Sequence, residues 1–173
     1  MDYSSLLEIV SIDSSRYLVN VGSDYVGTDE HRFDEALDIA VNAKYPFNMR
    51  AARVIEESVS RYKRFAEPRL EYFISVLTWH TNDGVKRAFL KVIEGFLPFK
   101  VNDDLLGLVI TICFDKLNGI ETVSVKYYSI NCLMKIVKRE PDIKYELQQS
   151  LENQIGLNTV AFDRYIRKKI VKL

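Results

Sequence analysis

The feature that most constrains the fold is a short motif that recurs along the chain. It reads Met49-Arg50, Val85-Lys86, Val125-Lys126 and, more loosely, Phe162-Asp163, so successive copies lie 36, 40 and 37 residues apart. Helical sequence flanks each copy. A period in this range is typical of a solenoid of helical pairs, because each pair can bury its apolar face only by stacking on the next. We therefore predict an all-α protein.

Apolar spacing and turn residues divide the chain into about four helical pairs. In the first helix of the first pair, Thr28 is the predicted N-cap, and Phe33 and Leu37 follow on one helical face. We expect one domain over residues 1–173. Its repeats are placed at about 29–66, 67–100, 101–140 and 141–173, and residues 1–28 are expected to form short helices that cap the open end of the stack.

Composition argues against several classes of protein. Lys plus Arg and Asp plus Glu both number 24, so net charge alone steers the chain toward neither nucleic acid nor membrane. Cys113 and Cys132 lie in apolar helical stretches without Cys-x-x-Cys spacing, which favours buried thiols over a disulfide framework or a zinc site. Asp2 and Glu8 stand where a secretory signal carries positive charge, and no apolar run is long enough to span a bilayer. These features predict a cytoplasmic protein that does not associate with membranes.

The recurring motif resembles that of the HEAT and armadillo-like repeat family. In that family the second helix of a unit opens with an acidic or amide residue, then Val-Arg, then Ala. The segments Asn48–Ala52 and Asp83–Ala88 match this opening, Val125–Tyr128 matches it with Tyr in place of Ala, and Asp163 departs from it where a cation belongs. The resemblance covers about residues 29–173 and implies a right-handed α-α solenoid.

The run Pro141–Leu147, followed by an Arg- and Lys-rich helix, resembles small bacterial HEAT-like proteins. Some of those carry the label adenylosuccinate lyase. That label does not suit this chain, because the lyase fold needs a far longer chain and its Ser-Ser-x-Met-Pro signature has no counterpart here.

Charge is distributed unevenly between the two helices of each pair, which we call A (first) and B (second). The four predicted B helices hold 17 cations and five acids, a net charge of +12, whereas the A helices hold four cations and 13 acids, a net charge of −9. In HEAT-like stacks the B helices line the concave side. The resemblance therefore implies a basic inner surface and an acidic back.

The B-helix cations fall into two groups. Arg50, Lys86 and Lys126 occupy the motif position, where the family's cation ties one unit to its neighbour, so we interpret them as structural. For the others, a solvated face and a surface for an anionic ligand are both open interpretations. The predicted binding residues are Arg53, Arg87, Lys91, Lys135, Lys138, Arg164, Arg167 and Lys168.

No residue set marks a reaction. His31 and His80 belong to different predicted repeats. The pair Asp103-Asp104 opens an apolar helix, where carboxylates serve as N-cap and dipole partners more often than as metal ligands. There is no glycine loop for phosphate. We predict no catalytic residue, no metal and no cofactor. Trp79 is expected to pack between neighbouring repeats.

The predicted function is therefore non-catalytic: an interaction module that binds an acidic protein through the B-helix face, with no small-molecule substrate evident. The alternative is nucleic-acid binding, up to a glycosylase that resembles DNA-alkylation-repair relatives of this fold. Such an enzyme needs a catalytic acid among aromatic residues, and Asp163 or Glu94 are the candidates.

Overall fold

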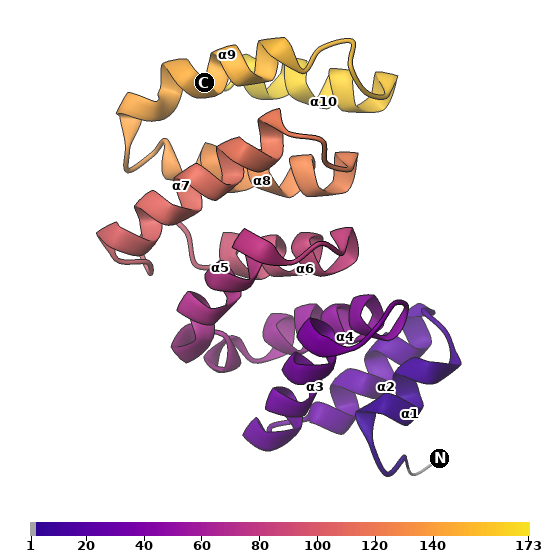
Figure 1. Cartoon of the computed structure of the whole chain (residues 1–173). Coiled ribbons are helices and arrows are strands. Elements are labelled where there is room, and N and C mark those ends of the chain that lie inside the picture. Colours follow the sequence, from indigo (N-terminus) through magenta and orange to yellow (C-terminus); the bar gives the residue numbers. More distant parts are fainter. Residues whose placement is uncertain (1–2) are drawn as a thin grey trace. The chain divides into compact units, whose positions relative to one another are not determined.

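The computed structural model describes residues 3–173 (Figure 1). Within that range it contains ten α-helices, three short 3-10 helices and no strand, which confirms the all-α prediction. Met1 and Asp2, the first two residues of the predicted cap, lie outside the described residues. None of the helices in the described range is long and apolar enough to cross a membrane.

The α-helices follow one another with short connections. They are α1 (Leu6–Ile12), α2 (Arg16–Val26), α3 (Glu30–Asn42), α4 (Phe47–Arg61), α5 (Leu70–Trp79), α6 (Asp83–Glu94), α7 (Asp103–Asn118), α8 (Val123–Ile136), α9 (Lys144–Asn153) and α10 (Val160–Ile170). The 3-10 helices are η1 (Lys63–Phe65), η2 (Glu67–Arg69) and η3 (Pro141–Ile143). The chain divides into two compact units, of which unit 1 ends at Val92 and unit 2 begins at Ile93.

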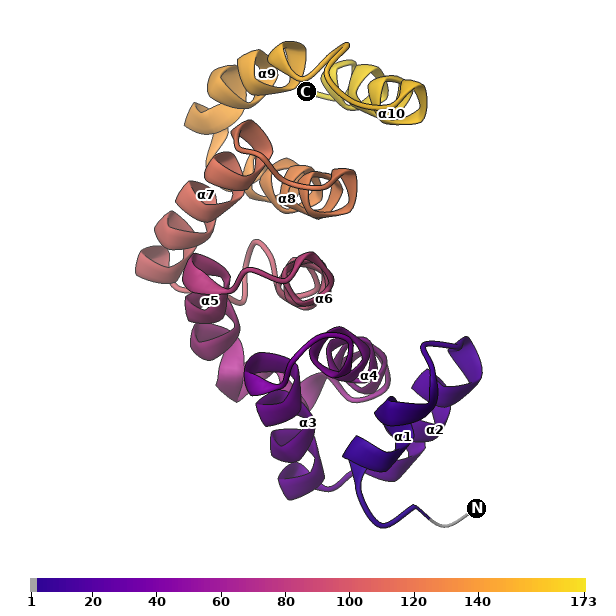
Figure 2. The ribbon, with the colours of Figure 1, turned by 45° about the vertical axis from the view of Figure 1, so that its right-hand side comes forward.

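Unit 1 is built in two layers. Figure 2 shows α3 and α5 in one layer and α4 and α6 in the other, with α2 against α4. Phe33 stacks on Phe65 with ring centroids 4.6 Å apart, and Phe73 meets Phe89 edge to face at 4.8 Å. All four rings are buried, and the Phe73–Phe89 contact joins the layer of α5 to the layer of α6.

The N-terminal segment forms a helical pair, α1 and α2. A Cβ atom at Gly22 would lie only 2.6 Å from Cγ2 of Val54, so the glycine is what allows α2 to approach α4 this closely. The following helix begins one residue later than predicted. Its N-cap is Asp29 rather than Thr28, because the Asp29 carboxylate accepts hydrogen bonds from the backbone N–H groups of His31 and Arg32.

Unit 2 repeats the same layering, with α7 and α9 in one layer and α8 and α10 in the other (Figure 2). Asn102 caps α7 by accepting from the N–H of Leu105, and Thr159 caps α10 by accepting from the N–H of Phe162. Cys113 and Cys132 are both fully buried and form no disulfide within the described residues, as predicted. They pack as small core residues of α7 and α8.

Candidate interaction surface

The motif cations point into their own units. The Arg50 guanidinium on α4 donates to the carbonyl oxygens of Val10 at 2.8 Å and Ser11 at 3.2 Å. These carbonyls lie in the last turn of α1, where backbone acceptors lack intrahelical partners and the helix end attracts positive charge. Arg50 therefore fastens α4 to the C-terminal end of α1.

The other two motif cations are buried. The Lys86 ammonium lies 2.8 Å from a carboxylate oxygen of Asp83, one turn earlier on α6. The Lys126 side chain donates to Oε1 of Gln154, at the end of α9, over 2.6 Å. Because only 6% of Lys126 is exposed, burial of its ammonium lowers the pKa of this lysine.

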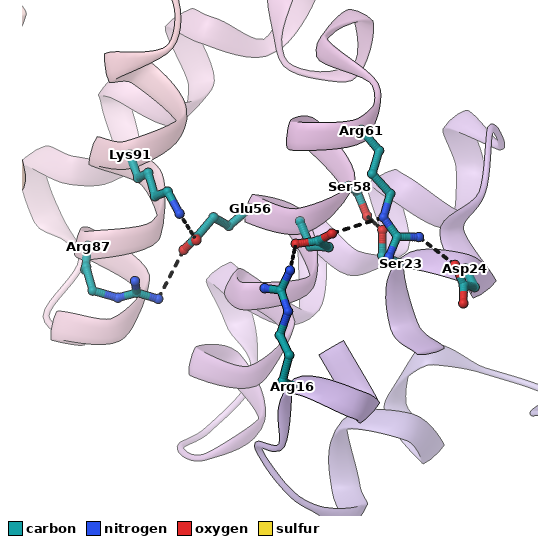
Figure 3. A network of polar contacts seen from close by, with 9 residues as sticks. Arg16, Ser23, Asp24, Glu56, Ser58, Arg61, Arg87 and Lys91 are labelled. Carbon is teal, nitrogen blue, oxygen red and sulfur yellow. Dashed lines mark hydrogen bonds and ion pairs between the residues drawn. The ribbon is translucent and has the colours of Figure 1, made fainter. Parts of the chain in front are cut away.

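Two predicted binding residues of unit 1, Arg87 and Lys91, converge on one acid. Figure 3 shows both α6 side chains reaching Glu56 on α4. Nη2 of Arg87 lies 3.1 Å from Oε2 of Glu56, and the Lys91 ammonium contacts its Oε1. The Glu56 side chain is only 15% exposed. This carboxylate thus joins α4 to α6 and neutralises part of their positive charge.

A second set of ion pairs, from the next residue of α4, reaches toward α2 (Figure 3). Glu57 accepts from Arg16 at 2.6 Å and from Arg61 at 3.1 Å, and Arg61 also reaches Asp24 at 2.5 Å. Arg53, a further predicted binding residue, donates to the backbone carbonyl of Ser14. The sequence interpretation missed the acids of this network, since their pairing depends on the register between helices.

In unit 2, Lys135 also has an internal partner. Its ammonium donates to the backbone carbonyl of Glu94 at 2.7 Å and lies 3.5 Å from that residue's carboxylate. Arg139, which follows α8, donates to the carbonyls of Pro98 and Val101 and forms an ion pair with Asp103. Both cations therefore hold α8 against the segment that precedes α7.

Helices α8 and α10 meet through a polar cluster around Asn131. Its Oδ1 accepts a hydrogen bond from the Tyr165 hydroxyl at 2.7 Å and another from the Lys169 ammonium at 2.9 Å. Burial raises the pKa of the Tyr165 phenol. Burial, and next the neighbouring charge of Lys172, lower the pKa of Lys169.

A groove of about 380 Å³ opens beside this cluster. Four lysines line it, one from α8, one just after α8, one from α10 and one just after α10. We call it the lysine groove; its lysines are Lys135, Lys138, Lys169 and Lys172. Met134, Val137 and Leu173 add apolar walls, and Glu94 supplies its one acidic side chain.

Some cations of unit 2 have no acidic partner. They are exposed, they lie on or just after α8 and α10, and none of them forms an ion pair within residues 3–173. We call this set the basic surface of unit 2: Lys138, Arg164, Arg167, Lys168 and Lys172. Sequence reasoning named the first four but not Lys172, which belongs to the same terminal run of cations.

The acids and histidines considered for chemistry are engaged elsewhere or stand apart. The Asp163 carboxylate accepts from the backbone N–H of Gly156, and Glu94 lies against Lys135. His80 is buried, which lowers its pKa, and its Nδ1 accepts from the N–H of Asn82. In the described part of the chain no three His, Cys, Asp or Glu residues gather as metal ligands would. The side chain of Trp79, predicted to pack between neighbouring repeats, is instead 57% exposed.

Comparison with curated proteins and with solved structures found no match to the chain. Comparison with protein families matches residues 8–172 to the HEAT repeat domain. The match spans α2 through α10 and most of α1, and the helices that it covers form the layered pairs described above. The chain therefore belongs to the HEAT repeat family and has its all-α, α-α solenoid fold.

Proposed function

We propose that this chain is a non-catalytic protein-interaction module that binds an acidic segment of a partner through the basic surface of unit 2. HEAT repeats are generally modules of protein interaction without catalytic activity. What is specific to this chain is the chemistry of the surface that it offers. A location in the cytoplasm remains a prediction from the sequence.

The observation that carries the proposal is the contrast between paired and unpaired cations. In unit 1, Arg87 and Lys91 share Glu56, and Arg53 is bound to a backbone carbonyl. The Glu56 carboxylate partly neutralises Arg87 and Lys91, which therefore offer little net attraction to a ligand. The five cations of the basic surface of unit 2 face solvent without ion pairs in the described part of the chain.

An acidic protein segment suits this surface better than a neutral one. Exposed charges attract an anionic partner over a Debye length of about 10 Å at 0.1 M salt, which raises the association rate. Arginine adds planar, bidentate contacts to carboxylates, whereas lysine acts as a mobile point charge. The mixture of both on α10 therefore favours carboxylate-rich segments that bind with moderate, salt-dependent affinity.

The test begins with a pull-down from the native cell in which retained protein and nucleic acid are both identified. The retained partner is then titrated against the triple variant Arg164→Gln, Arg167→Gln, Lys168→Gln. At roughly 0.2–1 kcal/mol per exposed charge, or about 0.6–3 kcal/mol for three, we expect the dissociation constant to rise on the order of 3- to 150-fold. The matched control replaces by Gln three other exposed cations that form no ion pair within residues 3–173: Lys44, Lys63 and Lys144.

The control variant should keep the affinity of the natural chain, since it loses the same total charge from other places. Equal losses in both variants would show that only net charge matters and would refute the proposal. Nucleic acid is the contrasting result. If duplex DNA binds tightly and its affinity falls steeply on a log-log plot against salt, the chain reads phosphates of nucleic acid and the acidic-protein proposal is wrong.

A further inference from the structure

We infer that the lysine groove of unit 2 holds a phosphoryl group on a side chain of the partner's segment, with an apolar side chain of the same segment beside it. The inference rests on the proposed function, because it names the chemistry of the partner at that surface. It adds a defined pocket, with Lys135 and Lys169, to a basic surface that would otherwise recognise only overall charge.

The charges of the groove do not balance. Lys135 forms an ion pair with the carboxylate of Glu94 at 3.5 Å, and the charge of Glu94 also acts on Lys169. Lys169 donates to the neutral amide oxygen of Asn131, and neither Lys138 nor Lys172 forms an ion pair within residues 3–173. Four lysines and one acidic side chain, that of Glu94, thus line a groove of about 380 Å³.

The crowding of these ammonium groups has a cost that an anion would remove. Lys169 is held on Asn131 and lies over the ring of Tyr165, 5.0 Å from its centroid, so the side chain cannot turn freely away. Burial is the main cause that lowers the pKa of Lys169, and the nearby charge of Lys172 lowers it further; only that second effect reflects the crowding. A negative group in the groove would be attracted by all four lysines and would restore the preference of Lys169 for its charged form.

A phosphoryl group fits this site better than a carboxylate for two reasons. It carries a charge of about −1.5 to −2 at neutral pH, against −1, and it has three strong acceptor oxygens that can take donors from several directions. Lysine ammonium groups on flexible stems converge readily on such an acceptor. The walls formed by Met134, Val137 and Leu173 leave an apolar contact for a neighbouring side chain of the same segment.

The experiment uses the full chain and a matched pair of synthetic peptides. Each peptide is a short acidic sequence of Gly, Asp and Glu with one central Ser followed by Leu, and the two differ only in whether that Ser is phosphorylated. Binding is measured by fluorescence anisotropy at physiological salt. We expect the phosphorylated peptide to bind about tenfold more tightly or better, since charge-assisted hydrogen bonds are roughly twice as strong as neutral ones.

Two double variants separate the groove from the surface around it. Lys138→Gln with Lys172→Gln removes two lysines of the groove and should abolish the preference for phosphate. Arg164→Gln with Lys168→Gln removes the same charge from exposed α10 positions that do not line the groove, and should weaken both peptides alike. All four residues are exposed, so neither variant is expected to disturb folding.

The outcomes distinguish this inference from the proposed function. If the natural chain binds both peptides equally, the groove does not recognise phosphate, and binding of acidic segments stands alone. If neither peptide binds, both ideas fail. If the α10 control loses the phosphate preference as fully as the groove variant, the preference is one of general charge and the groove is not the site. Displacement of the phosphopeptide by low concentrations of duplex DNA would identify nucleic acid as the source of phosphate and overturn the inference.

Discussion

The motif cation of α8 permits a test in which two substitutions at one contact should act in opposite directions. Lys126 is almost fully buried and donates to Oε1 of Gln154 over 2.6 Å. We predict that Lys126→Met leaves the free energy of unfolding unchanged or raises it by about 1 kcal/mol, whereas Gln154→Leu lowers it by about 2–3 kcal/mol.

The difference follows from what each change leaves behind. Methionine has nearly the length of lysine, and without the ammonium Oε1 of Gln154 still accepts from Asn158 at 3.3 Å. Gln154→Leu, by contrast, leaves the buried Lys126 ammonium without the oxygen that it contacts, and this costs more free energy than the intact pair contributes. Loss of the attraction to Glu121, which partly offsets the effect of burial on Lys126, keeps the gain from the Met variant small.

The dependence on pH gives a second measurement of the same prediction. Burial lowers the pKa of Lys126 below its ordinary value of 10.5, so the charged lysine destabilises the folded chain. This destabilisation is absent above the unfolded-state pKa, where the lysine is neutral in both states, and reaches its full size as pH falls through the folded-state pKa. The advantage of Lys126→Met should therefore be largest near pH 7 and shrink as pH rises toward 10. Urea unfolding followed by circular dichroism measures both variants. A loss of more than about 1 kcal/mol in the Met variant at pH 7 would refute the reasoning.

Three further predictions concern unit 1. Glu56→Gln should lower the free energy of unfolding by about 1–2 kcal/mol, because Arg87 and Lys91 both lose their acid, and this loss should shrink in 1 M salt. The control is Asp115→Asn, at an exposed acid without an ion pair in residues 3–173, which should change the free energy of unfolding by less than about 0.5 kcal/mol. Phe89→Ala should cost about 3–5 kcal/mol in the same urea assay, since the ring is fully buried against Phe73; a loss below 1 kcal/mol would mean that this core is not packed as described. Because burial lowers the pKa of His80 below 6.5, the unfolded chain takes up a proton at a higher pH than the folded chain does, so the melting temperature should fall as pH drops from about 7 to 5. His80→Asn should flatten that fall, and an unchanged slope would assign it to other groups.

Much of the fold could be predicted from the sequence because the signals are local. The 36, 40 and 37 spacing and the apolar stripe that includes Phe33 and Leu37 both report helical periodicity, and the structure has helices in those places. The residues that cap a helix are local signals too, and the predicted N-cap of α3, Thr28, lies one residue before the observed N-cap, Asp29. The burial of Cys113 and Cys132 likewise followed from their places on apolar helices.

The candidate site was decided by tertiary structure. From the sequence, Arg87, Lys91 and Lys138 are equivalent cations on B helices. The packing of α6 on α4 places the first two at Glu56, whereas Lys138, just after α8, is exposed. Trp79 shows the same limit, since its helix was predicted but its exposure was not. The sequence determines which face of each helix is apolar, because that depends on neighbours three and four positions away. Which charges meet depends on the register between helices about 35–41 residues apart, and that register is set by the packing of whole layers.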